Sequence, residues 1–119
     1  MDIGSKGLVE VNLILPQATS LTFDVIHKDD EGTVIDHSES TAHMAMQTRD
    51  SSRTTYHLDS CCTCTAEFIR VAIPASITET MPIGKMSWDM IVTTTYGDQI
   101  RLCYGIASVV DTFALDEGQ

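Results

Sequence analysis

The chain of 119 residues carries 17 acidic and 7 basic side chains, which gives a formal net charge of −10 at pH 7. This charge repels phosphate backbones, so we expect no nucleic-acid partner. Apolar residues make up 43% of the sequence, but no run approaches the roughly 18 apolar residues that a membrane span requires, and no membrane association is expected.

The first half of the chain alternates between apolar and polar residues with a period of two, which predicts β-strands. Pro16 closes the first of these strands, and the polar corner at residues 28–32 predicts a turn in which Gly32 adopts a positive φ. Within the strand expected at 41–47, Ala42, Met44 and Met46 are expected to face inward. The expected strands cover residues 8–15, 21–27, 33–35 and 41–47.

The second half of the chain continues the same alternation. A weak strand is expected at 54–58, a strong one at 64–73 before Pro74, and a single helical turn or a loop at 75–82. Two further strands, 85–95 and 99–110, form a hairpin around a Tyr-Gly-Asp-Gln corner. Two sets of residues are each expected to share one face of this hairpin: Met86, Trp88, Met90 and Val92, and Ile100, Leu102, Tyr104 and Ile106.

Six to eight strands with short turns and almost no helix predict an all-β protein, an antiparallel β-sandwich. The length suits one domain, which we place at residues 20–119. Residues 1–19 are either an N-terminal arm that pairs with the sheet edge of a neighbouring molecule or the first strand of the same sandwich. Trp88 is expected to anchor the core, together with a methionine-rich face formed by Met44, Met46, Met86 and Met90.

The sharpest local motif is Cys61-Cys62-Thr63-Cys64, which contains a C-x-x-C pair. Structural zinc takes four ligands, so one pair supplies only half of a tetrahedral site. The candidate metal ligands are His57, Cys61, Cys64 and Cys103. The favoured interpretation is that the cysteines are small buried side chains in a reduced protein, because the N-terminus has no secretory-signal pattern.

No other motif indicates catalysis. Asp29, Asp30, Glu31 and Asp36 surround Gly32 without the spacing of a calcium loop, so an acidic turn is the better interpretation. The sequence contains neither a nucleophile elbow nor a phosphate-binding glycine loop. We therefore predict no enzyme, no catalytic residue and no cofactor. The histidines are scattered without helical pairing: His27, His37, His43 and His57.

Several short sequence segments, taken in chain order, resemble a pattern found in small virion proteins of tailed bacteriophages. The likeness covers about residues 20–112 and is to immunoglobulin-like domains related to the N-terminal domain of baseplate upper proteins. Gln47, where that family often has Arg, and the cysteine cluster depart from the pattern. The segments are LTFDV at 21–25, GTVID at 32–36, TAHMAMQ at 41–47, VAIPASIT at 71–78, WDM at 88–90, GDQIRL at 97–102 and Gly105.

The resemblance implies an immunoglobulin-like fold and a structural role in the virion, after synthesis in the host cytoplasm. The first expectation is a capsid decoration or cement protein that sits on the outer shell as a homo-oligomer, a dimer or trimer, and binds the major capsid protein. The alternative within the same family is a tail, baseplate or neck adaptor that binds a tail or baseplate protein. A third hypothesis, from a different class, is a small metal-binding module built on the cysteine cluster.

Overall fold

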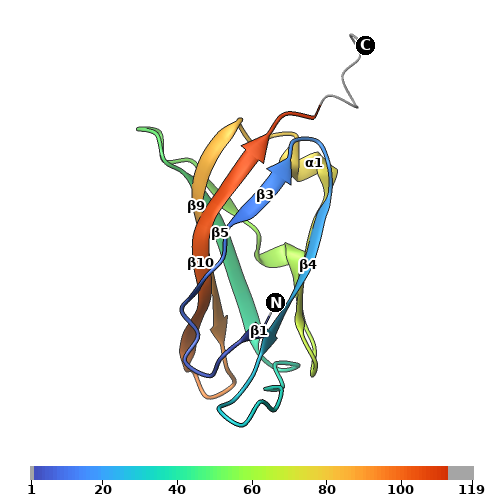
Figure 1. Ribbon diagram of the computed structural model, residues 1–119, viewed down its shortest axis with the longest axis vertical. Helices are drawn as coiled ribbons and strands as arrows, with labels where there is room; N and C mark the ends of the chain where they lie inside the picture. Colours follow the sequence, from blue (N-terminus) through green and yellow to red (C-terminus); the bar gives the residue numbers. More distant parts are fainter. Residues whose placement is uncertain (1, 113–119) are drawn as a thin grey trace.

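The structure is a computed structural model that describes residues 2–112. Its strands form two sheets that enclose one apolar core, so the protein is a mainly β, sandwich-like fold (Figure 1). The first sheet has the order β1-β4-β8-β7. Its strands are β1 (Asp2–Ile3), β4 (Leu21–His27), β7 (Cys62–Cys64) and β8 (Ile69–Ile73).

The second sheet has the order β2-β10-β9-β5-β6, and β3 pairs with β10 beside β2. The predicted hairpin is confirmed, because β9 and β10 pair antiparallel along most of their length. A single helical turn, α1 (Ala75–Thr78), follows Pro74 as expected, and η1 (Asp59–Cys61) is a short 3-10 turn. The strands of this sheet are β2 (Val9–Glu10), β3 (Leu13–Pro16), β5 (Thr41–Thr48), β6 (Thr55–His57), β9 (Gly84–Thr93) and β10 (Gln99–Val110).

The N-terminal segment contributes strands to both sheets of its own chain, and all of these strands pair in parallel. β1 lies parallel to the end of β4, whereas β2 and β3 lie parallel to β10. The sheets are therefore mixed, and the prediction of a purely antiparallel sandwich was wrong for this segment. The expected continuous strand at 8–15 is also interrupted, since residues 11 and 12 lie between β2 and β3.

A β-bulge in β10 changes which side chains of this strand face the core, so the predicted alternation was wrong beyond this point. The register with β9 shifts between Arg101 and Cys103, so that Leu102 and Cys103 are both fully buried. After the bulge, the inward positions are Ala107 and Val109. Tyr104 and Ile106 therefore do not share the face of Leu102, as the uninterrupted alternation had predicted; both lie on the outer side and are half-buried.

Two predicted strands also differ in the structure. The stretch 64–73 is a hairpin, because Thr65 bonds Phe68 through backbone and side chain and turns the chain back from β7 to β8. Residues 33–35 form only an isolated bridge, between Val34 and Lys28, in the long β4–β5 connection. The segment nevertheless returns alongside β4, which matters for the site described below.

The core confirms the inward-facing methionines. Met44, Met46, Met86 and Met90 are each at most 1% exposed, and Trp88 is 3% exposed. The ring of Trp88 packs edge-to-face against Phe23 of the first sheet, with centroids 6.3 Å apart. This contact joins the two sheets at their centre, where aromatic pairs add to the apolar area that is buried. No helix in residues 2–112 is long and apolar enough to cross a membrane.

Candidate functional site

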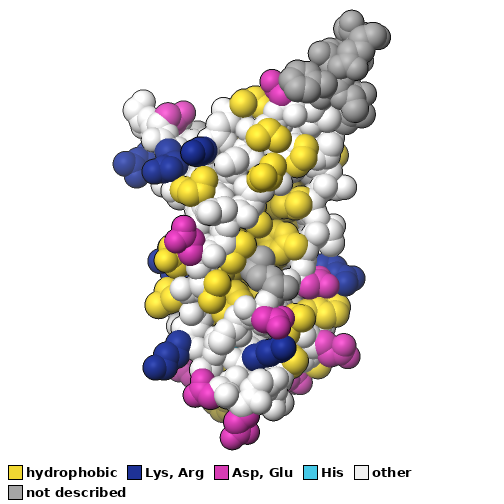
Figure 2. Space-filling view, in the orientation of Figure 1, with side chains coloured by type: hydrophobic (Ala, Val, Ile, Leu, Met, Phe, Trp, Pro, Cys, Tyr) yellow, Lys and Arg dark blue, Asp and Glu magenta, His cyan; other side chains and the backbone are white. Residues whose placement is uncertain are grey.

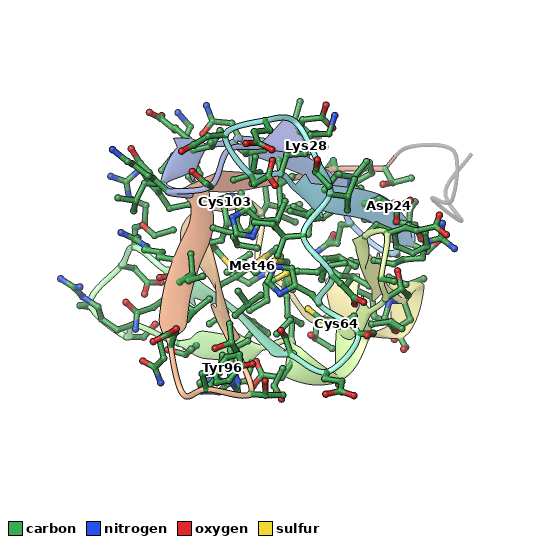
Figure 3. All side chains as sticks on the ribbon, turned by 90° about the horizontal axis from the view of Figure 1, so that it is seen from below. Asp24, Lys28, Met46, Cys64, Tyr96 and Cys103 are labelled. Carbon is green, nitrogen blue, oxygen red and sulfur yellow. The ribbon has the colours of Figure 1, made fainter. Side chains whose placement is uncertain are left out.

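The structure does not assemble the predicted metal ligands into one centre. Cys61 ends η1 and is buried, Cys64 lies half-buried on β7, and Cys103 is buried in β10 of the opposite sheet (Figure 3). His57 lies exposed on β6. Within residues 2–112, no three His, Cys, Asp or Glu side chains are placed to hold a metal ion together.

The cysteines are free thiols held in apolar surroundings. Burial raises the pKa of Cys103 to about 12, and burial together with the neighbouring thiols raises the pKa of Cys62 to about 12. Burial also raises the pKa of Cys61 and of Cys64. Because the thiolate is the form that attacks or binds metal, these residues are poor nucleophiles at neutral pH.

A shallow depression of about 250 Å³ with polar and apolar lining lies on the outer face of the second sheet. At its edge, Arg101 Nε lies 3.3 Å from a carboxylate oxygen of Asp89, and the guanidinium lies over the ring of Tyr104 at 4.9 Å. Both charges are thus engaged with each other. The lining residues are Ala45, Gln47, Thr55, Ser87, Trp88, Asp89 and Arg101.

A second cleft, of about 380 Å³, opens at the end of the sandwich between two loops. One wall is residues 35–40, from the β4–β5 connection, and the other is Thr94–Tyr96, from the β9–β10 turn. Tyr96 is 92% exposed at this end of the molecule (Figure 3). Asp36 and Glu39 give the cleft an acidic rim.

A buried pair of histidines includes one residue of the first wall, His37. His27 and His37 are 2% and 3% exposed, and their rings are nearly parallel, with an interplanar angle of 9°. His27 Nδ1 lies 2.9 Å from His37 Nε2. Burial lowers the pKa of His37, the neighbouring imidazole of His27 lowers it further, and Asp36 acts in the opposite direction.

No sequence motif marks this pair, although the predicted turn at 28–32 contains a signal for it. A turn at 28–32 followed by an extended segment brings residues after Gly32 back alongside the end of β4. The structure shows this return in the bridge between Lys28 and Val34 and in the bond from Ile35 N to the His27 carbonyl. Two residues beyond Ile35, His37 meets His27. Helical spacing identifies histidines that share one face of a helix, so it does not detect two histidines that meet through a returning loop.

The other two histidines remain at the surface. His43 on β5 lies 3.0 Å from Asp59 in a half-exposed ion pair, and His57 is exposed on the neighbouring strand β6. Comparison of the chain with models of known protein families and with curated proteins gives no match. The strand order and the surface are therefore the observations from which a function has to be inferred.

Proposed function

We propose that this chain is an immunoglobulin-like structural protein of a tailed-phage virion, and that it decorates the outer shell of the capsid. The observation that carries the proposal is the strand order. An immunoglobulin sandwich has strands A, B, E and D in one sheet and G, F and C in the other, with C′ added in variable-type domains. Taken in chain order, β1-β4-β8-β7 corresponds to A-B-E-D, and β10-β9-β5-β6 corresponds to G-F-C-C′.

The core supports the same assignment while differing from antibody domains. Antibody domains join strands B and F by a disulfide. Here β4 and β9, which correspond to B and F, are joined by the edge-to-face contact of Phe23 and Trp88. An aromatic pair in this place suits a chain made in a reducing compartment, where disulfides do not persist.

The surface supports a role in assembly. Ile14 is 66% exposed between the buried Leu13 and Leu15, and Val110 is exposed after the buried Val109. Both belong to the paired strands β3 and β10, and Figure 2 shows hydrophobic side chains gathered along these strands. Exposed apolar side chains that cluster in this way are typical of protein-binding surfaces. The net charge of −10 suits a position outside the shell, away from packaged DNA.

The partner in this proposal is the major capsid protein, and the chain acts as a homo-oligomer, a dimer or trimer. Quantitative mass spectrometry of purified virions tests it. Decoration predicts many copies per particle, in a fixed ratio to the major capsid protein. A few copies per particle would instead indicate the alternative role, an adaptor at the tail, baseplate or neck.

A metal analysis of the purified protein distinguishes the proposed structural role from a metal-binding module. Metal analysis is expected to find no stoichiometric zinc, because the structure does not bring His57, Cys61, Cys64 and Cys103 together. Zinc at one equivalent per chain would contradict the structural role and return attention to the cysteines.

A further inference from the structure

The His27–His37 pair joins three segments of the chain that are distant in sequence. His27 ends β4, and its Nε2 lies 3.1 Å from the carbonyl oxygen of Ser5, in the segment after β1. His37 lies in the β4–β5 connection, and its Nδ1 lies 2.9 Å from the hydroxyl of Ser40. With the contact of 2.9 Å between the two rings, these bonds form a continuous chain from Ser5 to Ser40.

The direction of each bond follows from the acceptor at one end. A carbonyl oxygen only accepts, so His27 Nε2 carries a proton and donates to Ser5. In the neutral imidazole, His27 Nδ1 is then an acceptor, and His37 Nε2 donates to it. His37 Nδ1 is left as an acceptor for the hydroxyl of Ser40. With both rings neutral, each is therefore the Nε2–H tautomer, and every ring nitrogen is satisfied.

Protonation disturbs this arrangement in two stages. A first proton on His37 Nδ1 places an imidazolium in a buried site, where desolvation penalises charge. A second proton, on His27 Nδ1, would set two N–H groups against each other across 2.9 Å, with no acceptor between them. The contact between the rings can therefore persist with both rings neutral or with one ring charged, whereas the doubly charged pair has to separate.

Among the neighbouring charged groups, Asp36 favours a charged His37, but burial and the His27 imidazole act more strongly in the opposite direction. Asp2 of β1 and Lys28, the residue after β4, pair with each other at 3.0 Å. In the β4–β5 connection, Asp29 accepts two backbone N–H groups, Asp30 accepts from Ser5 Oγ, and Asp36 accepts from Ser38 N. The remaining titratable groups of the segments around the pair, the β9–β10 turn included, are Lys6, Glu31, Glu39, Tyr96 and Asp98.

We propose that the His27–His37 pair is a pH-sensitive latch: at neutral pH it ties the loop wall of the cleft to β4 and to the N-terminal segment, and acid releases it. His37 itself lines the cleft opposite Tyr96, so release changes the shape of this end of the molecule. The inference concerns the isolated chain and does not depend on the proposed role in a virion.

The direction of the effect follows from the pKa of His37, which is lowered from its ordinary value of 6.5. Well above about pH 6.5, folded and unfolded forms are both neutral at this residue, and the latch is complete. As the pH falls below that value, the open form takes up a proton before the closed form does. The closed form is therefore lost progressively on acidification.

Amide hydrogen exchange of the purified protein tests the latch directly. The reporter amides are Lys28, bonded to the Ile3 carbonyl, and Ile35, bonded to the His27 carbonyl. After correction for intrinsic exchange, their protection is expected to fall about tenfold or more between about pH 7.5 and about pH 5, because a histidine with an ordinary pKa of about 6.5 is almost fully protonated at about pH 5 in the open form. The amide of Leu58, bonded to Met44 elsewhere in the sandwich, is expected to keep its protection.

Two variants separate the pair from other titrating groups. His37→Gln keeps a neutral donor near His27 and is expected to remove the pH dependence at Lys28 and Ile35. His57→Gln, which replaces an exposed histidine, is expected to leave it unchanged. Protection at Leu58 at about pH 7.5 shows whether each variant is folded.

A measurement on the unmodified chain keeps the proposal testable if His37→Gln does not fold. Nitrogen chemical shifts of the imidazoles are expected to show both rings as Nε2–H tautomers at about pH 7.5, with His37 titrating below its ordinary value. A ring of the opposite tautomer, a His37 that titrates at or above the ordinary value, or reporter protection that does not change with pH would each overturn the latch.

Discussion

The indole nitrogen of Trp88 donates a hydrogen bond of 2.8 Å to the backbone carbonyl of Val11. Val11 belongs to the short link between β2 and β3, and its own N–H donates to the Tyr104 carbonyl at 2.8 Å. A core tryptophan therefore fastens the N-terminal segment to the strands β9 and β10. This explains how two very short parallel strands, which have little stability of their own, stay in place.

Replacing Trp88 by Phe tests this fastening. The phenyl ring keeps most of the core contact but leaves the Val11 carbonyl without its donor, which is expected to destabilise the protein by about 1–3 kcal/mol. Trp88→Ala is expected to cost about 3–5 kcal/mol, because it also leaves a cavity. Urea unfolding followed by circular dichroism measures both. Tyr96→Phe, at an exposed position, serves as the control, and equal midpoints for Trp88→Phe and the control would contradict the fastening.

The same carbonyl of Val11 lies close to Gly105, and this close approach explains why a glycine occurs within a long strand. A Cβ at this position would lie 2.0 Å from the Val11 oxygen, a distance that backbone atoms cannot accommodate without moving. Gly105→Ala is therefore expected to lower stability by about 1–3 kcal/mol and to increase exchange of the Val11 amide. Gly4→Ala is the matched control, since a Cβ there meets no atom within 4 Å. A Gly105→Ala protein as stable as Gly4→Ala would show that the link at Val11 moves aside freely.

The buried thiols predict slow alkylation in the native state. The pKa of Cys103, raised from 9.0 to about 12 by burial, lowers its thiolate fraction at about pH 8 by about a thousandfold. Iodoacetamide followed by peptide mass spectrometry is expected to label Cys103 and Cys62 far more slowly in the folded protein than in urea. Rapid native labelling of Cys103 would show that the core opens, or that the thiol is activated.

The pair of Asp59 and His43 predicts a small stabilisation that acid removes. Asp59 also accepts the backbone N–H of Met44 at 3.0 Å, and the hydrogen bond from His43 is the largest cause of its lowered pKa. A lowered carboxyl pKa stabilises the folded form above about pH 3.8, and this contribution is lost as the pH falls through the folded-state pKa.

The variant Asp59→Asn is therefore expected to be less stable than the unmodified chain at about pH 5, by less than about 1 kcal/mol because the pair is half exposed. The difference is expected to shrink toward about pH 2.5, as the carboxyl group itself takes up a proton. Urea midpoints at the two pH values measure it. A difference that grew on acidification would mean that protonated Asp59 is the stabilising form.

Local patterns in the sequence were enough to predict the hairpin, the inward-facing methionines and the helical turn after Pro74. Each depends on neighbours in the chain: alternation, a polar corner or a proline. The parallel pairing of β2 and β3 with β10 has no such signal, because the partners are about ninety residues apart and no turn joins them.

The bulge at Leu102 shows a different limit of prediction from the sequence. The stretch Gln99–Val110 contains apolar residues at both odd and even positions, so two registers fit equally well until the partner strand selects one. The histidine pair shows a third limit, since its two members meet through a loop whose return had been predicted but whose contacts had not. The strand pattern alone predicted a sandwich, whereas composition does not single out a partner-binding surface, because such surfaces are about as apolar as the rest.

Cryo-electron microscopy of virions with a tag on the C-terminus of this chain tests the proposed role in the virion most directly. Decoration predicts tag density in many copies over the outer shell, at the junctions of neighbouring capsomers. Density confined to the neck, the tail or the baseplate would replace decoration by the adaptor role. Virions without the tag, from cells that make the tagged protein, would contradict a structural role in the virion altogether.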